Sequence, residues 1–384
     1  MKKSLSIYVH WPFCISKCPY CDFNSHVAKN QVNQDEWVVA YINELKYFYS
    51  QIGDRKIETI YFGGGTPSLM DPKIVESIIN QVDLLWGIEN NVEITIEANP
   101  SSIEYNKFEA FKKAGVNRTS IGVQSLNDRD LKFLGRAHNV GDIYAAIEVA
   151  QQTFENYTFD LIYARPEQSI NDWMNELGEA IKLVSNHISL YQLTIEKGTP
   201  FYKMYKDNEF SLPTEEVAIE MYELTGQYLA DFGIKSYEIS NYARVGYESR
   251  HNLSYWKYKD FIGIGAGAHG RYTNLEGKRF ATIMHHEPKK WLKGTMLDKI
   301  EMQSIRSIDN DEAIDEMILM GLRLQGGIFK KHFRELFQED IENRLNMRKV
   351  NILSDEGFIC NEDDKIFLSD KGVLVCNKII SEIL

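Results

Sequence analysis

The feature that most constrains the fold is an alternation of short apolar runs and amphipathic stretches in the first half of the chain. The apolar runs predict strands at residues 5–10, 57–63, 92–98, 119–124, 158–164 and 187–195. The amphipathic stretches predict helices at residues 34–50, 72–85, 103–114, 140–151 and 170–184. Repeated units of this kind favour an α/β fold with a parallel sheet, and about six strands indicate an incomplete barrel.

Three cysteines follow the first predicted strand with the spacing C-x3-C-x2-C, at Cys14, Cys18 and Cys21. Three thiolates on one loop can hold an iron–sulfur cluster and leave its fourth iron open to the amino and carboxylate groups of S-adenosylmethionine (SAM). The alternative is a structural zinc site in an interaction protein without redox chemistry. Zinc would need a fourth ligand, for which only His10 or His26 is at hand.

Polar residues stand at the carboxyl ends of the later predicted strands. A glycine-rich run, 63–68, follows the second strand, Glu97 ends the third, Gln124 ends the fourth, and Asp160 lies on the fifth. In α/β barrels this face carries the active site. Taken singly, the glycines could form a tight turn and the carboxylates could be buried ion-pair partners. Together they predict a binding site at that edge of the sheet.

Two further residues are candidates for contacts with SAM. Arg136 could be an exposed cation at a helix end, or could act with Gln124 to clamp the SAM carboxylate. Tyr20, between the second and third cysteines, could shield the cluster or stack on adenine.

Charge and composition exclude some classes of protein. The formal net charge of −12 argues against a nucleic-acid partner held by phosphate contacts. No apolar run is long enough to span a membrane, which leaves at most peripheral membrane association. The N-terminal segment reads as a first strand and not as a signal peptide. Five cysteines, three of them clustered, suit a reducing compartment, so a cytoplasmic location is expected.

The second half of the chain is less regular. Helices are predicted at 214–232, 309–324, 330–336, 341–351 and 370–380, with a strand at 236–243 and a small hairpin over 357–369. These elements predict a barrel over residues 1–232, an extension over 233–305 and a smaller, mostly helical C-terminal domain over 306–384. The helices and hairpin of that last domain are similar to a winged-helix module.

Several motifs together resemble the HemN-like branch of the radical SAM proteins. They include the cysteine loop with its preceding Tyr-Val-His-Trp-Pro-Phe, Gly-Gly-Gly-Thr-Pro-Ser, Glu-Ala-Asn-Pro, Ser-Ile-Gly-Val-Gln-Ser and Leu-Gly-Arg-Ala-His. The resemblance implies an incomplete (β/α)6 barrel, SAM, and a [4Fe–4S] cluster held by Cys14, Cys18 and Cys21. The residues that match the SAM contacts of this branch are Tyr8, Tyr20, Gly64, Gly65, Thr66, Glu97, Gln124, Arg136 and Asp160.

Two subfamilies of this branch compete. The oxygen-independent coproporphyrinogen III dehydrogenases carry a further cysteine where this chain has Phe23, and a long extension before the first strand. The HemW-type heme chaperones carry the motif H-N-x-x-Y-W, which this chain has over residues 251–256. The chain therefore resembles the chaperones, and we expect no coproporphyrinogen decarboxylation. The resemblance implies that heme is bound and delivered to apo-hemoproteins of the respiratory chain.

The heme site is expected at the H-N-x-x-Y-W motif. His251 offers an imidazole to the iron, and Tyr255 and Trp256 offer flat apolar surface to the porphyrin. Because the motif follows the barrel strands, heme is expected beside the SAM site and bound together with SAM. The short motif alone favours a different interpretation, in which His251 is a hydrogen-bonded histidine beside an aromatic core cluster. His269, in the second glycine-rich run, is the next candidate for the axial ligand.

Overall fold

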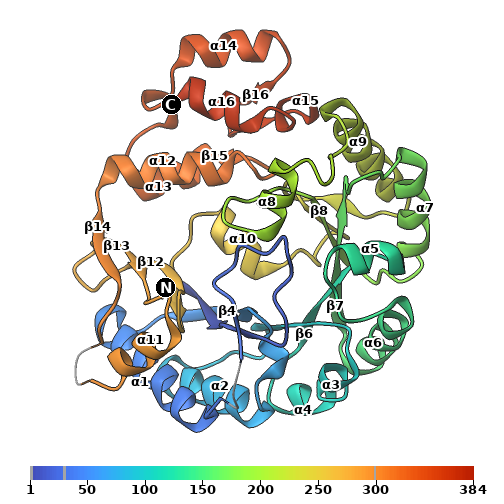
Figure 1. The fold of residues 1–384 in the computed structure, drawn as a ribbon. Coiled ribbons are helices and arrows are strands. Elements are labelled where there is room, and N and C mark those ends of the chain that lie inside the picture. The colour runs from blue at the N-terminus through green and yellow to red at the C-terminus, as the bar shows by residue number, and fades with distance from the viewer. Residues whose placement is uncertain (1–2, 29–31, 298–299) are drawn as a thin grey trace.

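The computed structural model describes residues 3–28, 32–297 and 300–384. Its largest element is a sheet whose described strands number twelve, in the order β14-β13-β12-β11-β1-β4-β5-β6-β7-β8-β10-β9. Six neighbouring parallel strands form its centre (Figure 1): β1 (Ser4–Trp11), β4 (Lys56–Gly64), β5 (Glu93–Ala98), β6 (Arg118–Gln124), β7 (Asn156–Tyr163) and β8 (His187–Gln192). They correspond to the six predicted strands. The sheet curves without closing, which confirms the incomplete barrel.

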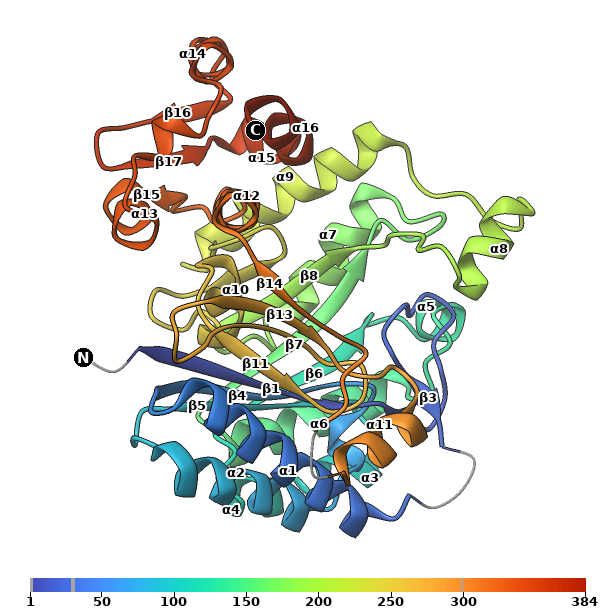
Figure 2. The ribbon, with the colours of Figure 1, turned by 90° about the vertical axis from the view of Figure 1, so that its left-hand side faces the viewer.

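Helices connect these strands and cover the outer face of the curved sheet (Figure 2). They are α1 (Gln34–Ile52), α2 (Pro72–Trp86), α3 (Ser102–Tyr105), α4 (Phe108–Lys113), α5 (Asp128–Phe133), α6 (Val140–Thr153) and α7 (Ile170–Ala180). The helix predicted over 103–114 is interrupted at Asn106 and Lys107, and α5 was not predicted. The continuous core between helices and sheet is apolar because the central strands are buried on both faces.

Additional strands extend the sheet on both sides of this centre. Beside β1 lie the parallel β11 (Phe261–Ile264) and then the antiparallel β12 (His269–Thr273), β13 (Arg279–Ile283) and β14 (Ser304–Ile308). Beside β8 lie the antiparallel β10 (Asn241–Ala243) and β9 (Lys235–Ser236), so the strand predicted over 236–243 is two short strands. The remaining elements of this part are β2 (Phe13–Cys14), β3 (His26–Val27), η1 (Pro67–Leu69), α8 (Pro200–Lys206), α9 (Glu215–Asp231), α10 (Arg250–Trp256) and α11 (Pro288–Thr295).

The last part of the chain forms a smaller, mostly helical unit at the edge of the barrel (Figures 1 and 2). It comprises α12 (Asn310–Gly321), β15 (Ile328–Phe329), α13 (Lys330–Phe337), η2 (Ile341–Asn343), α14 (Met347–Asp355), β16 (Ile359–Asn361), β17 (Lys365–Leu368), α15 (Asp370–Val373) and α16 (Cys376–Ile383). A second apolar cluster fills it. The predicted hairpin is β16–β17, which β15 extends to three strands. Helix α12 packs against α10, which brings this unit to the mouth of the barrel.

Within the described ranges, no helix is long and apolar enough to cross a membrane.

Candidate functional site

The cysteine loop runs from the end of β1 across the carboxyl edge of the sheet. It packs directly on the glycines that follow β4, and this contact explains why glycines are required there. Gly64 has φ of 115°, and a Cβ atom at this position would lie 2.5 Å from the His10 ring. A Cβ atom on Gly65 would lie 2.8 Å from the carbonyl oxygen of Phe13. The loop and the glycine-rich run therefore form one closely packed unit.

The three loop thiols are half-buried and lie near one cation. The Nη1 of Arg136 donates to the Sγ of Cys18 at 3.3 Å. Burial raises the pKa of the Cys14 thiol, a hydrogen bond with Thr66 lowers it, and the nearby Cys21 raises it again. The Arg136 charge opposes the rise of the Cys14 pKa and so favours the thiolate form that an iron–sulfur cluster requires. In the ranges that the structure describes, no three Cys, His, Asp or Glu side chains surround a single metal-ion position.

Both histidines considered as a fourth zinc ligand already have hydrogen-bond partners. The Nδ1 of His10 is 3.0 Å from the Tyr8 hydroxyl, and its Nε2 is 3.0 Å from the carbonyl oxygen of Asn24. Burial lowers the His10 pKa to about 4, so the ring is neutral at physiological pH. The Nε2 of His26 lies 3.2 Å from the Asn24 side-chain oxygen. Both nitrogens of His10 and one nitrogen of His26 are thus already engaged, so the three thiols fit a cluster with one open iron better than tetrahedral zinc.

Glu97 lies at the end of β5 with both carboxylate oxygens engaged. The Tyr61 hydroxyl donates to Oε1 at 2.9 Å, and the Gly64 backbone N–H donates to Oε2 at 3.1 Å. Burial raises the Glu97 pKa to about 7 in spite of these hydrogen bonds. Asp160, on β7, is also buried enough that its pKa rises to about 6. Two carboxyl groups whose pKa values are raised by burial therefore stand at the sheet edge.

Arg136 is the centre of a polar network that connects several strand ends. Its Nη2 donates to the carbonyl oxygen of Gly122 at 2.9 Å and to the side-chain oxygen of Asn99. Asn99 in turn donates to the Thr66 hydroxyl at 3.2 Å. Gln124 begins the next loop in the left-handed region, with φ of 73°. The Gln124 side-chain nitrogen and the Arg136 Nη2 both lie beside Gly122, at 3.0 and 3.4 Å from the position that a Cβ atom would take there. The structure thus brings Arg136, Gln124 and Thr66 close to one another, together with Asn99.

Tyr20 lies on the other side of the Arg136 guanidinium. Its hydroxyl oxygen is 3.5 Å from Nη1, and its ring packs against Phe201 at a centroid distance of 6.2 Å. Burial raises the Tyr20 pKa well above its usual value, so the hydroxyl stays protonated. The tyrosine thus forms an apolar wall beside the thiols, with one polar atom directed at the arginine.

A cavity of about 1140 Å³ opens beside the cysteine loop and extends to the C-terminal unit. The residues that line it include three of the expected SAM contacts, Tyr8, Gly64 and Glu97. Its other walls come from α10, β11, β12 and α12, and include Tyr255 and Trp256. The cavity therefore joins the residues expected to bind SAM to the aromatic residues expected to bind heme.

His251 lies behind this cavity and is only 1% exposed. Its Nδ1 is 2.6 Å from the Thr59 hydroxyl, and its Nε2 is 2.7 Å from the Tyr255 hydroxyl. The ring stacks on Tyr61 at 4.9 Å, and burial lowers the His251 pKa to about 3. In this arrangement neither nitrogen is available to iron, and the geometry favours the hydrogen-bonded histidine over the axial ligand.

Three residues of the site were not identified from the sequence as site residues. Asn99 stands in the Glu-Ala-Asn-Pro motif, which was its only signal. Tyr61 is a half-buried residue between two buried residues of β4 and gave no signal beyond that of a strand. Asn24 lies three residues after the last loop cysteine, and its partners, Ala266 and His286, lie more than two hundred residues away. Such contacts depend on tertiary structure.

Two protein-family models match parts of this chain. The family model described as Radical SAM superfamily matches residues 8–179. The model described as HemN C-terminal domain matches residues 308–375.

Several relatives match almost the full chain. The heme chaperone HemW of Buchnera aphidicola (from Acyrthosiphon pisum) is 35% identical over 98% of this chain and 97% of its own length. HemW of Bacillus subtilis is 32% identical over 99% of each chain. The chain belongs to the HemW family of radical SAM proteins. Its matches extend to the mitochondrial radical S-adenosyl methionine domain-containing protein 1 of Bos taurus, 32% identical over 99% of this chain and 87% of that protein.

Among solved structures, coproporphyrinogen III oxidase (HemN) from Escherichia coli superimposes with a TM-score of 0.81. The superposition covers 99% of this chain and 90% of the other, at 19% sequence identity. It shows that the two proteins share one fold, including the C-terminal unit.

Proposed function

We propose that this protein is a heme chaperone that holds heme in the cavity beside a [4Fe–4S] cluster with SAM and delivers it to respiratory apo-hemoproteins. Membership of the HemW family implies the radical SAM cofactors and suggests heme. The residues proposed to bind each ligand are Cys14, Cys18 and Cys21 for the cluster, and Tyr8, Tyr20, Gly64, Gly65, Thr66, Glu97, Gln124, Arg136 and Asp160 for SAM.

The observation that carries the proposal is the continuity of the cavity. It is larger than the roughly 300–1,000 Å³ that one small-molecule site usually occupies, and two sets of residues line it. The set at the sheet edge is polar and charged, as SAM requires. The set on α10 and β11 is aromatic, with Tyr255 and Phe261 in edge-to-face contact at 4.6 Å. A flat apolar macrocycle packs favourably on such a surface.

The chain's own residues have defined tasks in this proposal. A bound cluster would supply one electron to the SAM sulfonium, which is the chemistry typical of radical SAM proteins. Arg136 carries a fixed positive charge between the thiol of Cys18 and the strand ends, where it can pair with the SAM carboxylate. Glu97 presents a carboxylate to the donors of SAM, with Tyr61 and Gly64 fixing its orientation.

The test is a heme titration of the anaerobically purified, cluster-loaded protein, run with and without SAM. One equivalent of heme should bind in both cases, and the cluster content should not change. A coproporphyrinogen III assay with SAM and a reductant runs in parallel and should give no decarboxylated product. Turnover in that assay would favour the dehydrogenase, and a protein that binds no heme would refute the chaperone.

A further inference from the structure

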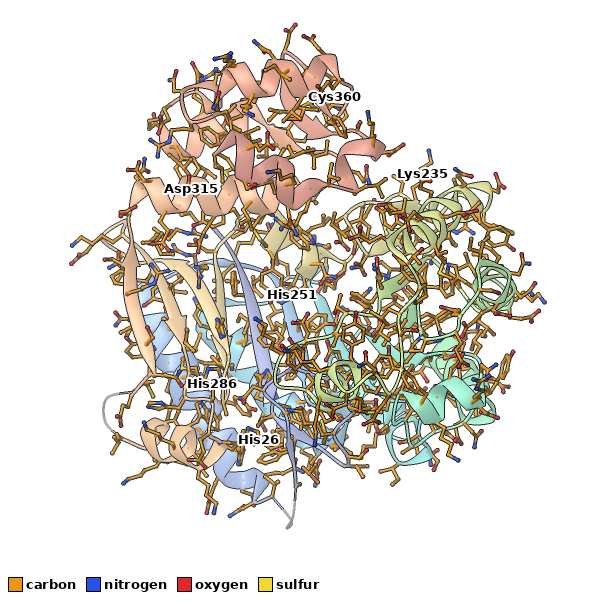
Figure 3. The ribbon with its side chains drawn as sticks, turned by 45° about the horizontal axis from the view of Figure 1, so that its top comes forward. His26, Lys235, His251, His286, Asp315 and Cys360 are labelled. Carbon is orange, nitrogen blue, oxygen red and sulfur yellow. The ribbon has the colours of Figure 1, made fainter. Side chains whose placement is uncertain are left out.

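Two exposed histidines line the cavity, in contrast to the buried His251. His269 begins β12, and His286 follows β13. Their ring centroids lie 6.3 Å apart with an angle of 59° between the planes. Figure 3 shows His286 on the β12–β13 side of the barrel mouth, apart from His251. Both imidazoles can therefore reach a ligand in the cavity without rearrangement of the core.

The distance between the two rings suits a shared metal centre. Imidazole nitrogens bind metal ions at about 2.0 Å, so two rings on opposite sides of one ion have centroids roughly 6 Å apart.

The backbone that carries these histidines is tied to the cysteine loop. The side-chain N–H of Asn24 donates to the carbonyl oxygens of Ala266, at 2.8 Å, and His286, at 3.0 Å. Gly267, with φ of 84°, allows this approach, since a Cβ there would lie 2.2 Å from the Asn24 nitrogen. The histidines are thus held at a fixed place beside the proposed cluster site.

The rest of the cavity supplies what a porphyrin needs besides an iron ligand. Trp256 and Phe261 provide apolar surface on the wall formed by α10 and β11. Arg323, beyond the end of α12, provides a cation for a propionate at the C-terminal unit. Its partners within the described ranges are neutral, the Leu319 carbonyl and the Asn377 amide oxygen.

We propose that the His269–His286 pair, and not His251, supplies the imidazole ligand to the heme iron in this cavity. The inference rests on the proposed chaperone function, because it names the iron ligand of that same site. Arg323, which lines the same cavity, would be available to pair with a propionate of the bound heme.

The test compares the His269→Ala/His286→Ala double variant with the parent protein, both cluster-loaded and anaerobic. Heme affinity should fall at least ten-fold, and the magnetic circular dichroism bands of imidazole-ligated heme should disappear. Free imidazole added to the double variant should restore these bands. His332→Ala, on the exposed face of α13, is the matched control and should behave as the parent.

The outcomes separate the inference from the function on which it rests. A double variant that takes up heme with the parent's affinity and spectrum overturns the histidine assignment and leaves the chaperone proposal intact. The histidine assignment is also overturned if the double variant loses heme binding and added imidazole does not restore it, because the histidines would then act through packing. A parent that binds no heme overturns both. Iron and sulfide content, measured on each variant, shows that the cluster site is intact.

Discussion

Replacement of His251 by alanine should destabilise the barrel, because this side chain is a buried structural element. The change removes a ring that is 1% exposed and stacked on Tyr61, and it leaves the hydroxyls of Thr59 and Tyr255 without their partner. Each unsatisfied hydroxyl costs about 1 kcal/mol and the cavity costs a similar amount or more, so we expect a loss of about 3 kcal/mol at pH 7. Urea unfolding followed by tryptophan fluorescence measures the loss.

The pH dependence of this loss gives a sharper test. An unfolded histidine has a pKa near 6.5, whereas burial holds the folded His251 near 3. Below pH 6.5 the unfolded chain binds a proton that the folded chain excludes, so the stabilisation is present above pH 6.5 and is lost as the pH falls toward 3. Between pH 6.5 and 5 the parent should lose about 2 kcal/mol that the variant does not lose.

The stability gap between parent and His251→Ala should therefore narrow from about 3 to about 1 kcal/mol on acidification to pH 5. The control, His286→Ala, replaces an exposed histidine and should stay within about 0.5 kcal/mol of the parent at both pH values. A gap that does not change with pH would show that His251 is charged or exposed in the folded protein. If His251→Ala is as stable as the parent but no longer shows the spectrum of imidazole-ligated heme, the structural role of His251 is refuted.

Three further predictions concern the cofactor sites. Alanine in place of any loop cysteine should abolish bound iron and sulfide, whereas Cys360→Ala should retain both; equal loss in Cys360→Ala would disprove the ligand assignment. Arg136→Ala should weaken SAM binding by about one to two decades in calorimetry of cluster-loaded protein; unchanged affinity would return Arg136 to a structural role. Since burial raises the Glu97 pKa to about 7, the carboxylate forms as the pH rises through 7, and SAM affinity should rise with it. Glu97→Gln should remove this dependence, and an equal slope in the variant would exclude Glu97 as its source.

The central barrel could be predicted because its signals are local. Buried parallel strands are apolar along their whole length, and all six were found within a few residues of their observed bounds. The cysteine loop and the polar strand ends are likewise contiguous in sequence. The glycine-rich run over 262–270 was harder, because glycine disfavours strands. It forms β11 and the start of β12, since Gly263 lies against the His269 backbone where no side chain fits.

The hydrogen-bonded role of His251 was one of two interpretations of its motif, but its distant partner could not be predicted, for a physical reason. The H-N-x-x-Y-W motif places His251 and Tyr255 one helical turn apart on α10, so their contact is local. The partner that decides the environment of the ring is Thr59, on β4 and 192 residues earlier. Nothing in the motif reveals that β4 covers this face of the helix. The same holds for Asn24, whose side chain joins the cysteine loop to a distant hairpin.

These long-range contacts connect the two proposed ligand sites. Tyr61 donates to Glu97, which faces the proposed SAM site, and its ring stacks on His251, which hydrogen-bonds Tyr255 in the cavity wall. On the opposite side, Asn24 joins the cysteine loop to the backbone of His286. A ligand that orders the proposed SAM site or the proposed heme site therefore acts on side chains that contact residues of the other site. Any resulting change in heme affinity on SAM binding must be matched by an equal change in SAM affinity on heme binding, because the coupling free energy is one quantity.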